Sequence, residues 1–488
     1  MKQEFMQPQA VDYSRKWYVM LAVAMSIFLG TIDGSIVNVA LPTLVKELDT
    51  TFATVQWVIL AYLLAISTLI LSMGRLGDMI GKKPVVLTGF VVFTAGSVLC
   101  GLAPTVYWLI AFRVLQAVGA AMTMALGIAI ITESFPPQER GRALGIGGAI
   151  VSVGIVVGPT LGGLIIDSLS WRWIFFVNLP VGIVGVFMGL RFLPAFKPGG
   201  RQKFDYPGAL TLFISLLALL LALTIGQQLG FGDSRILLLF AIWLVFLTLF
   251  IFVEWRSPQP MIDLRLFKSG LLSVNLITGF ITFIALAGAI ILMPFYLEDI
   301  LGYQPRQVGL LMAIVPIGLG SIAPISGSLS DRFGSRPITV IGLAMLVIGY
   351  LAMSTLTTQT SIVGYILRVL PVGLGMGIFQ SPNNSAIMGS APRERLGVIS
   401  GLLAVTRTLG QTTGIAILGA LWAGRVIAYY GAILPGGATT APAQAQVAGL
   451  HDTFLLITVL VAAGLLLSIW GLVQERRLHQ IEIAKVNP

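Results

Sequence analysis

The chain has 488 residues, of which 56% are hydrophobic and only 10% are charged, and its mean hydropathy is +0.93. This composition excludes a soluble globular protein, which needs more polar surface, and indicates an integral membrane protein. The net charge of +10 does not indicate a nucleic-acid partner, because the basic residues stand in short clusters between apolar runs. The single cysteine excludes an internal disulfide and the two histidines form no metal motif, so we expect neither a metal nor another cofactor.

Apolar windows long enough to cross a bilayer, which takes about 20 residues, recur fourteen times along the chain. In chain order we expect spanning helices at 17–41, 52–73, 84–103, 106–131, 142–167, 173–193, 207–226, 235–254, 272–297, 306–329, 337–356, 361–388, 396–422 and 453–474. The first region is too long for a cleavable signal peptide, and no small-residue cleavage site follows it. If the N-terminus lies inside, the cytoplasmic segments hold 22 of the 30 lysines and arginines, so both termini are predicted to be cytoplasmic.

The chain contains an internal repeat. The stretch GRLGDMIGKKP at 74–84 returns as GSLSDRFGSRP at 327–337, Arg113 has a counterpart in Arg368, and PQERGRALG is matched by PRERLGVISG in the same order. Ordered matches of this kind indicate two parallel six-helix halves, between which a transporter can alternate access. We therefore expect an N-terminal half at 1–200, an inserted helix pair with its linkers at 201–268, and a C-terminal half at 269–488.

Several stretches carry a resemblance to a known family. GRLGDMIGKKPVV resembles the loop 2–3 signature of the major facilitator superfamily. LIAFRVLQAVGAA resembles the helix 4 arginine motif of that superfamily, with Ala117 in place of the usual glycine. GIVVGPTLGG resembles its antiporter motif in helix 5. TIDGSIVNVALP and WRWIFFVNLP are similar to stretches of the fourteen-helix drug:proton antiporter branch. The resemblance implies an all-α integral membrane protein with the major facilitator fold, two six-helix halves plus two inserted helices. It also implies proton-coupled multidrug efflux, antibiotic resistance and no enzymatic activity.

The loop signature predicts a contact at the cytoplasmic surface that depends on conformation. Gly74 and Gly81 would let the backbone turn or pass close to neighbouring helices. Asp78, beside Lys82 and Lys83, could contact a helix N-terminus or an arginine of the other half only while the cytoplasmic side is closed, and would then act as a latch. The alternative is a solvated loop charge that adjusts the topology.

The antiporter motif predicts a close helix contact in helix 5. Gly154, Gly158, Gly162 and Gly163 clear one face of that helix, and Pro159 removes a backbone hydrogen bond and bends it. We expect this face to form a tight seam against the second half of the protein. The assignment to antiport depends on the resemblance.

The stretch FLGTIDGSIVNVALP places Asp33 deep in the first helix, where a charge is costly and usually functional. A rise of about 1.5 Å per residue puts Asp33 and Arg113 both roughly 10–12 Å below the outer boundary, so their side chains could meet. One interpretation is a permanent buried ion pair between two helices. The other is a proton-coupling site, in which Asp33 exchanges a proton for substrate while desolvation and the nearby cation act oppositely on its proton affinity.

Further polar residues lie inside the predicted helices, where they could present groups to a substrate or merely bond to neighbouring helices. These cavity candidates are Gln56, Trp57, Tyr62, Gln116, Gln380, Asn383, Asn384 and Arg407. Arg368 and Arg407 have no deep carboxylate in the second half to pair with. They could bind backbone carbonyls or attract an anionic group of the substrate, which would argue against a purely cationic specificity.

These residues and the resemblance predict a proton-driven exporter of lipophilic, cationic drugs or toxic compounds in a prokaryotic cytoplasmic membrane. The expected partners are a small-molecule substrate, protons and membrane lipids, and we expect a monomer. The alternative is an exporter of one specific metabolite, antibiotic or amphipathic organic acid. A membrane receptor or enzyme has less support, because the chain has no long soluble domain and no phosphate-binding loop.

Overall fold

The computed structural model describes residues 15–136, 140–194, 205–230, 232–257, 270–389, 396–432 and 437–486. Throughout these residues the regular structure is helical. The helices are α1 (Lys16–Glu47), α2 (Phe52–Ile80), α3 (Lys82–Gly101), α4 (Val106–Ser134), α5 (Arg140–Ser168), α6 (Trp173–Phe176), α7 (Asn178–Phe192), α8 (Tyr206–Leu229), α9 (Ser234–Arg256), α10 (Gly270–Phe295), η4 (Tyr296–Ile300), α11 (Pro305–Met312), α12 (Ile314–Phe333), α13 (Ser335–Met353), α14 (Ile362–Gly389), α15 (Leu396–Tyr430), η6 (Ala438–Thr440) and α16 (Ala443–Val486).

Each predicted span coincides with one helix or with two consecutive helices. The sixth span is divided into α6 and α7, and the tenth into α11 and α12. Among the described residues, twelve helical segments are long and apolar enough to cross a bilayer. Two shorter apolar stretches, Val153–Ser168 in α5 and Tyr206–Leu219 in α8, make the structure compatible with the predicted fourteen.

The repeated loop signature ends a helix in the same way in both halves. Gly81 follows α2 with φ of 101°, and its counterpart Gly334 follows α12 with φ of 86°. This left-handed region is open to glycine and disfavoured for residues with a Cβ, so glycine is needed where the chain turns into the next helix. The repeat seen in the sequence therefore corresponds to a repeated backbone turn.

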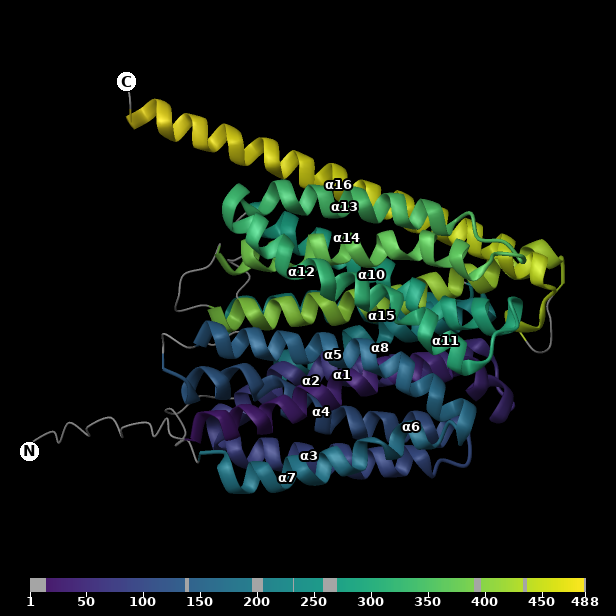
Figure 1. The fold of residues 1–488 in the computed structure, drawn as a ribbon, viewed down its shortest axis with the longest axis horizontal. Helices are drawn as coiled ribbons and strands as arrows, with labels where there is room; N and C mark the ends of the chain where they lie inside the picture. The colour runs from purple at the N-terminus through teal and green to yellow at the C-terminus, as the bar shows by residue number, and fades with distance from the viewer. Residues whose placement is uncertain are drawn as a thin grey trace, which may run out of the picture.

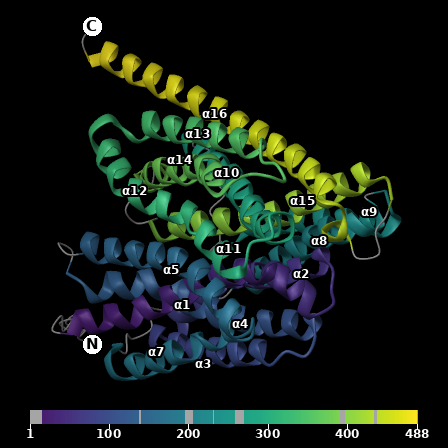
Figure 2. The same cartoon turned by 45° about the vertical axis from the view of Figure 1, so that its right-hand side comes forward.

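The helices form two bundles that lie side by side (Figure 1). Helices α1–α7 make up the lower bundle in this view, and α10–α16 the upper one. Helix α8 packs against α9, α2 and α15, so the expected inserted pair lies beside the junction of the bundles (Figure 2). The start of α1 and the end of α16 lie at the same end of the helices, as an even number of crossings requires (Figure 1).

Candidate functional site

Asp33 lies at the centre of a buried hydrogen-bonded network in the first bundle. Its Oδ2 accepts a hydrogen bond from Nη1 of Arg113 at 2.5 Å. Its Oδ1 accepts from Nε2 of Gln116 at 2.7 Å and from Nδ2 of Asn178 at 3.0 Å. The expectation that Asp33 and Arg113 meet is therefore confirmed, and two amide donors complete the carboxylate's surroundings.

A second layer of contacts holds these donors in place. Nη1 of Arg113 also donates to Oε1 of Gln116 at 2.6 Å, and its Nε donates to the carbonyl of Val58 at 3.0 Å. The guanidinium stacks 3.8 Å from the ring centroid of Tyr62. Ser97 Oγ accepts from Gln116 at 2.7 Å. The network thus connects α1, α2, α3, α4 and α7. Buried hydrogen bonds between helices make a helix arrangement specific.

The network is closed to solvent in this conformation. Asp33, Gln116 and Asn178 are 0% exposed and Arg113 is 1% exposed. Two of the predicted cavity residues, Gln116 and Tyr62, therefore contribute to the network and reach no open cavity. Asn178 was not predicted, although it stands in the quoted stretch WRWIFFVNLP as an isolated amide in an apolar run, which is a usable signal.

The two bundles touch at the end of the helices that lies away from the start of α1 and the end of α16. Lys46, at the end of α1, forms ion pairs with Glu298 at 2.9 Å and Asp299 at 3.0 Å in η4. The ring of Phe52 in α2 lies 4.9 Å from that of Phe295 in α10 and 4.9 Å from that of Trp422 in α15. Aromatic pairs at such distances add to the energy of burial, so this contact stabilises the end at which the two bundles meet. We call it the closed end.

Gln56, one turn beyond Phe52, lies buried at the same junction. Its amide oxygen and nitrogen have no hydrogen-bond partner among the described residues. A Cβ placed on Gly419 of α15 would lie 2.9 Å from these atoms, so the opposite bundle covers them directly. Trp57 beside it is half-buried.

The glycines of helix 5 face two different neighbours, which corrects the predicted seam. A Cβ on Gly154, Gly158 or Gly162 would collide with α1, a helix of the same bundle, and Ser35 of α1 donates to the carbonyl of Gly154 at 3.1 Å. Of these four glycines, only Gly163 meets the second bundle. A Cβ on Gly163 would lie 2.3 Å from the carbonyl oxygen of Pro305. The physical reason is that residues four apart share one helix face, whereas the next residue points about 100° away.

The α5 contact with the second bundle is reciprocal. A Cβ on Gly309 of α11 would lie 2.2 Å from the carbonyl oxygen of Pro159 in α5. Backbone thus packs directly on backbone between the bundles, and glycine is required on both sides of the contact.

The GRLGDMIGKKP motif is only partly described by the structure. Gly81 provides the turn described above, but a Cβ on Gly74 would have open space, and the close approach is at Gly77, which packs on Leu126. Lys82 pairs with Glu133, and Lys83 donates to the carbonyl of Leu190 at 2.9 Å. The side chain of Asp78 lies outside the described ones, so the latch stays a prediction.

The polar residues predicted in the second bundle differ in their surroundings. Asn383 is buried and donates to the carbonyl of Asn275 at 3.3 Å, as a helix-bonding amide does. Gln380 and Asn384, four residues apart on α14, are half-buried. Arg407 on α15 is also half-buried, and its Cζ lies 6.0 Å from the ring centroid of Phe283.

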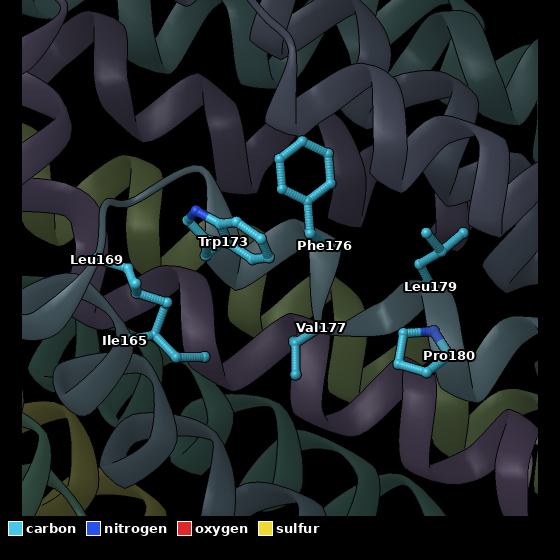
Figure 3. Close-up of a pocket in the computed structure, with 7 residues that line it drawn as sticks. All are labelled: Ile165, Leu169, Trp173, Phe176, Val177, Leu179 and Pro180. Carbon is cyan, nitrogen blue, oxygen red and sulfur yellow. The ribbon is translucent and has the colours of Figure 1, made fainter.

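An apolar pocket of about 600 Å³ lies between the end of α5 and the start of α7 (Figure 3). Its lining contains no ionisable side chain and comprises Ile165, Leu169, Trp173, Phe176, Val177, Leu179 and Pro180. Leu169 is 62% exposed and Trp173 50% exposed, so this hollow belongs to the surface of the bundle. An exposed tryptophan is typical of the membrane–water interface, and we do not assign the pocket to the charged site.

Two helical bundles that enclose intramembrane charges define a membrane transporter, and comparison with known proteins agrees. The model of the Major Facilitator Superfamily matches residues 23–415, and the chain belongs to this family. The riboflavin transporter RibZ of Clostridioides difficile is 36% identical over 412 residues, covering 84% of this chain and 89% of that protein. The multidrug transporter protein MdtP of Bacillus subtilis is 33% identical over 409 residues, covering 84% of this chain and 75% of that protein.

The fold is also found in solved transporter structures. A bacterial homolog of the human lysosomal transporter Spinster, in an inward-facing and unoccupied conformation, superposes with a TM-score of 0.66. It is 19% identical, and the match covers 94% of this chain and 97% of that one. The expected fold class, an all-α membrane protein with the major facilitator fold, is thereby confirmed.

Proposed function

We propose that this chain exports lipophilic drugs or toxic compounds across the cytoplasmic membrane in exchange for protons, by alternating access between its two halves. The observation that carries this proposal is the closed end of the bundle junction, where Lys46, Phe52 and Gly163 contact the second bundle. In the proposed topology both termini are cytoplasmic, so this closed end faces outward. The protein acts as a monomer and needs only substrate, protons and lipid.

The Asp33 network supports a role in proton coupling. Protonation of Asp33 would turn an acceptor of three hydrogen bonds into a neutral group, and the donors come from α4 and α7. The packing of α1 on these helices would change with it. Because the network is closed here, proton exchange takes place in another conformation, which is what coupling to alternating access requires.

Export of one specific metabolite is the second candidate, and the likeness to RibZ favours it. The charge of the substrate is a separate question, because Asp33 is enclosed and offers a cation no direct contact in this conformation.

Proton-gradient-driven uptake into inverted membrane vesicles tests the proposal. We expect uptake of several unrelated lipophilic dyes, abolished by a protonophore. Uptake of riboflavin alone would support the second candidate, and a protonophore-insensitive flux would reject proton coupling.

A further inference from the structure

Two arginines of the second bundle were without an obvious partner in the sequence, and the structure separates them. Nε of Arg368 donates to Oγ1 of Thr355 at 2.9 Å, and its Nη1 donates to the carbonyl of Gly364 at 2.9 Å. Arg407 has no hydrogen-bond or ion-pair partner within the described part of the chain. A charge within a membrane-spanning helix faces the bundle interior or a water-filled cavity, so an unpaired one there needs an explanation.

The neighbours of α15 show where Arg407 points. Gly414 packs against Ile284 of α10, and Gly419 packs against Gln56 of α2. Successive residues of an α-helix are rotated by about 100° around its axis. Measured from Gly414 in the direction of Gly419, Arg407 lies at roughly 20°, Gln411 at roughly 60° and Gly419 at roughly 140°. They therefore face the angle between α10 of their own bundle and α2 of the other, at the junction of the two bundles.

Arg407 and Gln411 form a polar pair on this face. Residues four apart on a helix have neighbouring side chains, and both are half-buried. Gln411, like Arg407, has no hydrogen-bond partner within the residues that the structure describes. The ring of Phe283 lies 6.0 Å from the guanidinium. A planar cation and an amide thus stand on one half-buried face of α15, and the guanidinium lies beside the buried ring of Phe283.

We propose that Arg407 and Gln411 bind an anionic group of the transported molecule, a carboxylate, sulfonate or phosphate. The guanidinium donates two parallel hydrogen bonds to such a group. The proposal rests on the proposed transport function and specifies its substrate class. It also follows from the contrast with Asp33, whose charge is neutralised inside the first bundle and attracts no cation.

The test compares two dyes with the same planar xanthene ring, the anionic carboxyfluorescein and a cationic rhodamine. Binding to the purified full-length protein in detergent is followed by dye anisotropy, and transport by uptake into proteoliposomes. We expect wild type to bind the anionic dye more tightly, Arg407→Gln to weaken that binding by about tenfold or more, and Arg407→Lys to weaken it less. Rhodamine binding should not fall. Arg368→Gln, which removes a cation held by carbonyl and hydroxyl oxygens, is the matched control and should bind both dyes as wild type.

The outcomes are distinguishable. The proposal is overturned if wild type, Arg407→Gln and Gln411→Leu all bind carboxyfluorescein with equal affinity. It is also overturned if wild type binds rhodamine more tightly than carboxyfluorescein. Displacement of carboxyfluorescein by phosphatidylglycerol without any dye uptake means that a lipid headgroup occupies the site, which also overturns it. Absence of transport for every dye tested, with anion binding intact, would instead contradict the proposed function and leave the anion site standing.

Discussion

Asp33 and Arg407 are both charges inside membrane-spanning helices, yet their surroundings are opposite. Asp33 is 0% exposed and accepts hydrogen bonds from Arg113, Gln116 and Asn178. Arg407 is half-buried at the bundle junction, and among the described residues its nearest interaction is with the ring of Phe283. Both charges are costly in a bilayer, but the first is neutralised by the protein and the second is left for a ligand.

This difference teaches that the position of a charge along a helix does not determine its role. The network around Asp33 draws on five helices of one bundle and holds them together, so its removal should affect folding or coupling. The face with Arg407 and Gln411 belongs to one helix, and its removal should affect recognition alone. The following changes test that division, from the largest expected effect to the smallest.

Removing one arginine from each region is the strongest test. Arg113→Ala leaves Asp33 as a buried charge without its counter-ion and should lower the free energy of unfolding by about 3–5 kcal/mol. Arg407→Ala should unfold as wild type, because its guanidinium has no ion pair to lose. Thermal unfolding in detergent measures the stability of both variants. Equal losses of stability would contradict the difference between the two regions.

Neutralising Asp33 should separate coupling from substrate recognition. Asp33→Asn retains a carbonyl acceptor for the network but can release no proton, so uphill transport should be abolished while downhill exchange and dye binding survive. The measurement is substrate-induced proton release from the purified protein, wild type against variant. Equal release from both would move the coupling site elsewhere, with Glu133 and Glu298 the next acids to examine.

A third change acts on the junction beside these two regions. Gly163→Ala places a Cβ 2.3 Å from the carbonyl oxygen of Pro305, a backbone atom that must move, so the closed end of the bundle junction should open. The reporter is Gln56→Cys, introduced into the Gly163→Ala variant and into its control. In the Gly163→Ala variant this cysteine should react with an impermeant maleimide, while the native Cys100 stays buried. Gly147→Ala is the matched control, since its Cβ comes no nearer than 3.6 Å to another side chain. Equal labelling of the two variants would contradict the role of this contact.

The smallest effect is expected at the ion pairs of Lys46, whose side chain is 58% exposed. Exposed pairs of this kind contribute about 0.2–1 kcal/mol, so Lys46→Gln should raise the labelling of Gln56→Cys by no more than about fivefold. The increase should disappear in high salt, where the wild-type pairs are screened as well. A larger change would mean that Lys46 controls the closed end more strongly than its exposure indicates.

Several features of the fold could be predicted from the sequence because they depend on short stretches of chain. Apolar length predicted the spanning helices, and the GRLGDMIGKKP signature predicted the turn that Gly81 makes, which the repeat at 327–337 makes again at Gly334. Even the meeting of Asp33 and Arg113 could be predicted, since the rise of a helix converts sequence position into depth.

The sequence by itself determined what lies at each depth, whereas only the tertiary structure decided which neighbour each helix face meets. The glycines at 154, 158 and 162 face α1 and not the second bundle, Asn178 joins the Asp33 network from a distant segment, and Arg368 is satisfied where Arg407 is not. The physical reason is that depth follows from counting residues along one helix. The rotation of a helix about its own axis, and the partner it packs against, are set by the packing of all the helices together.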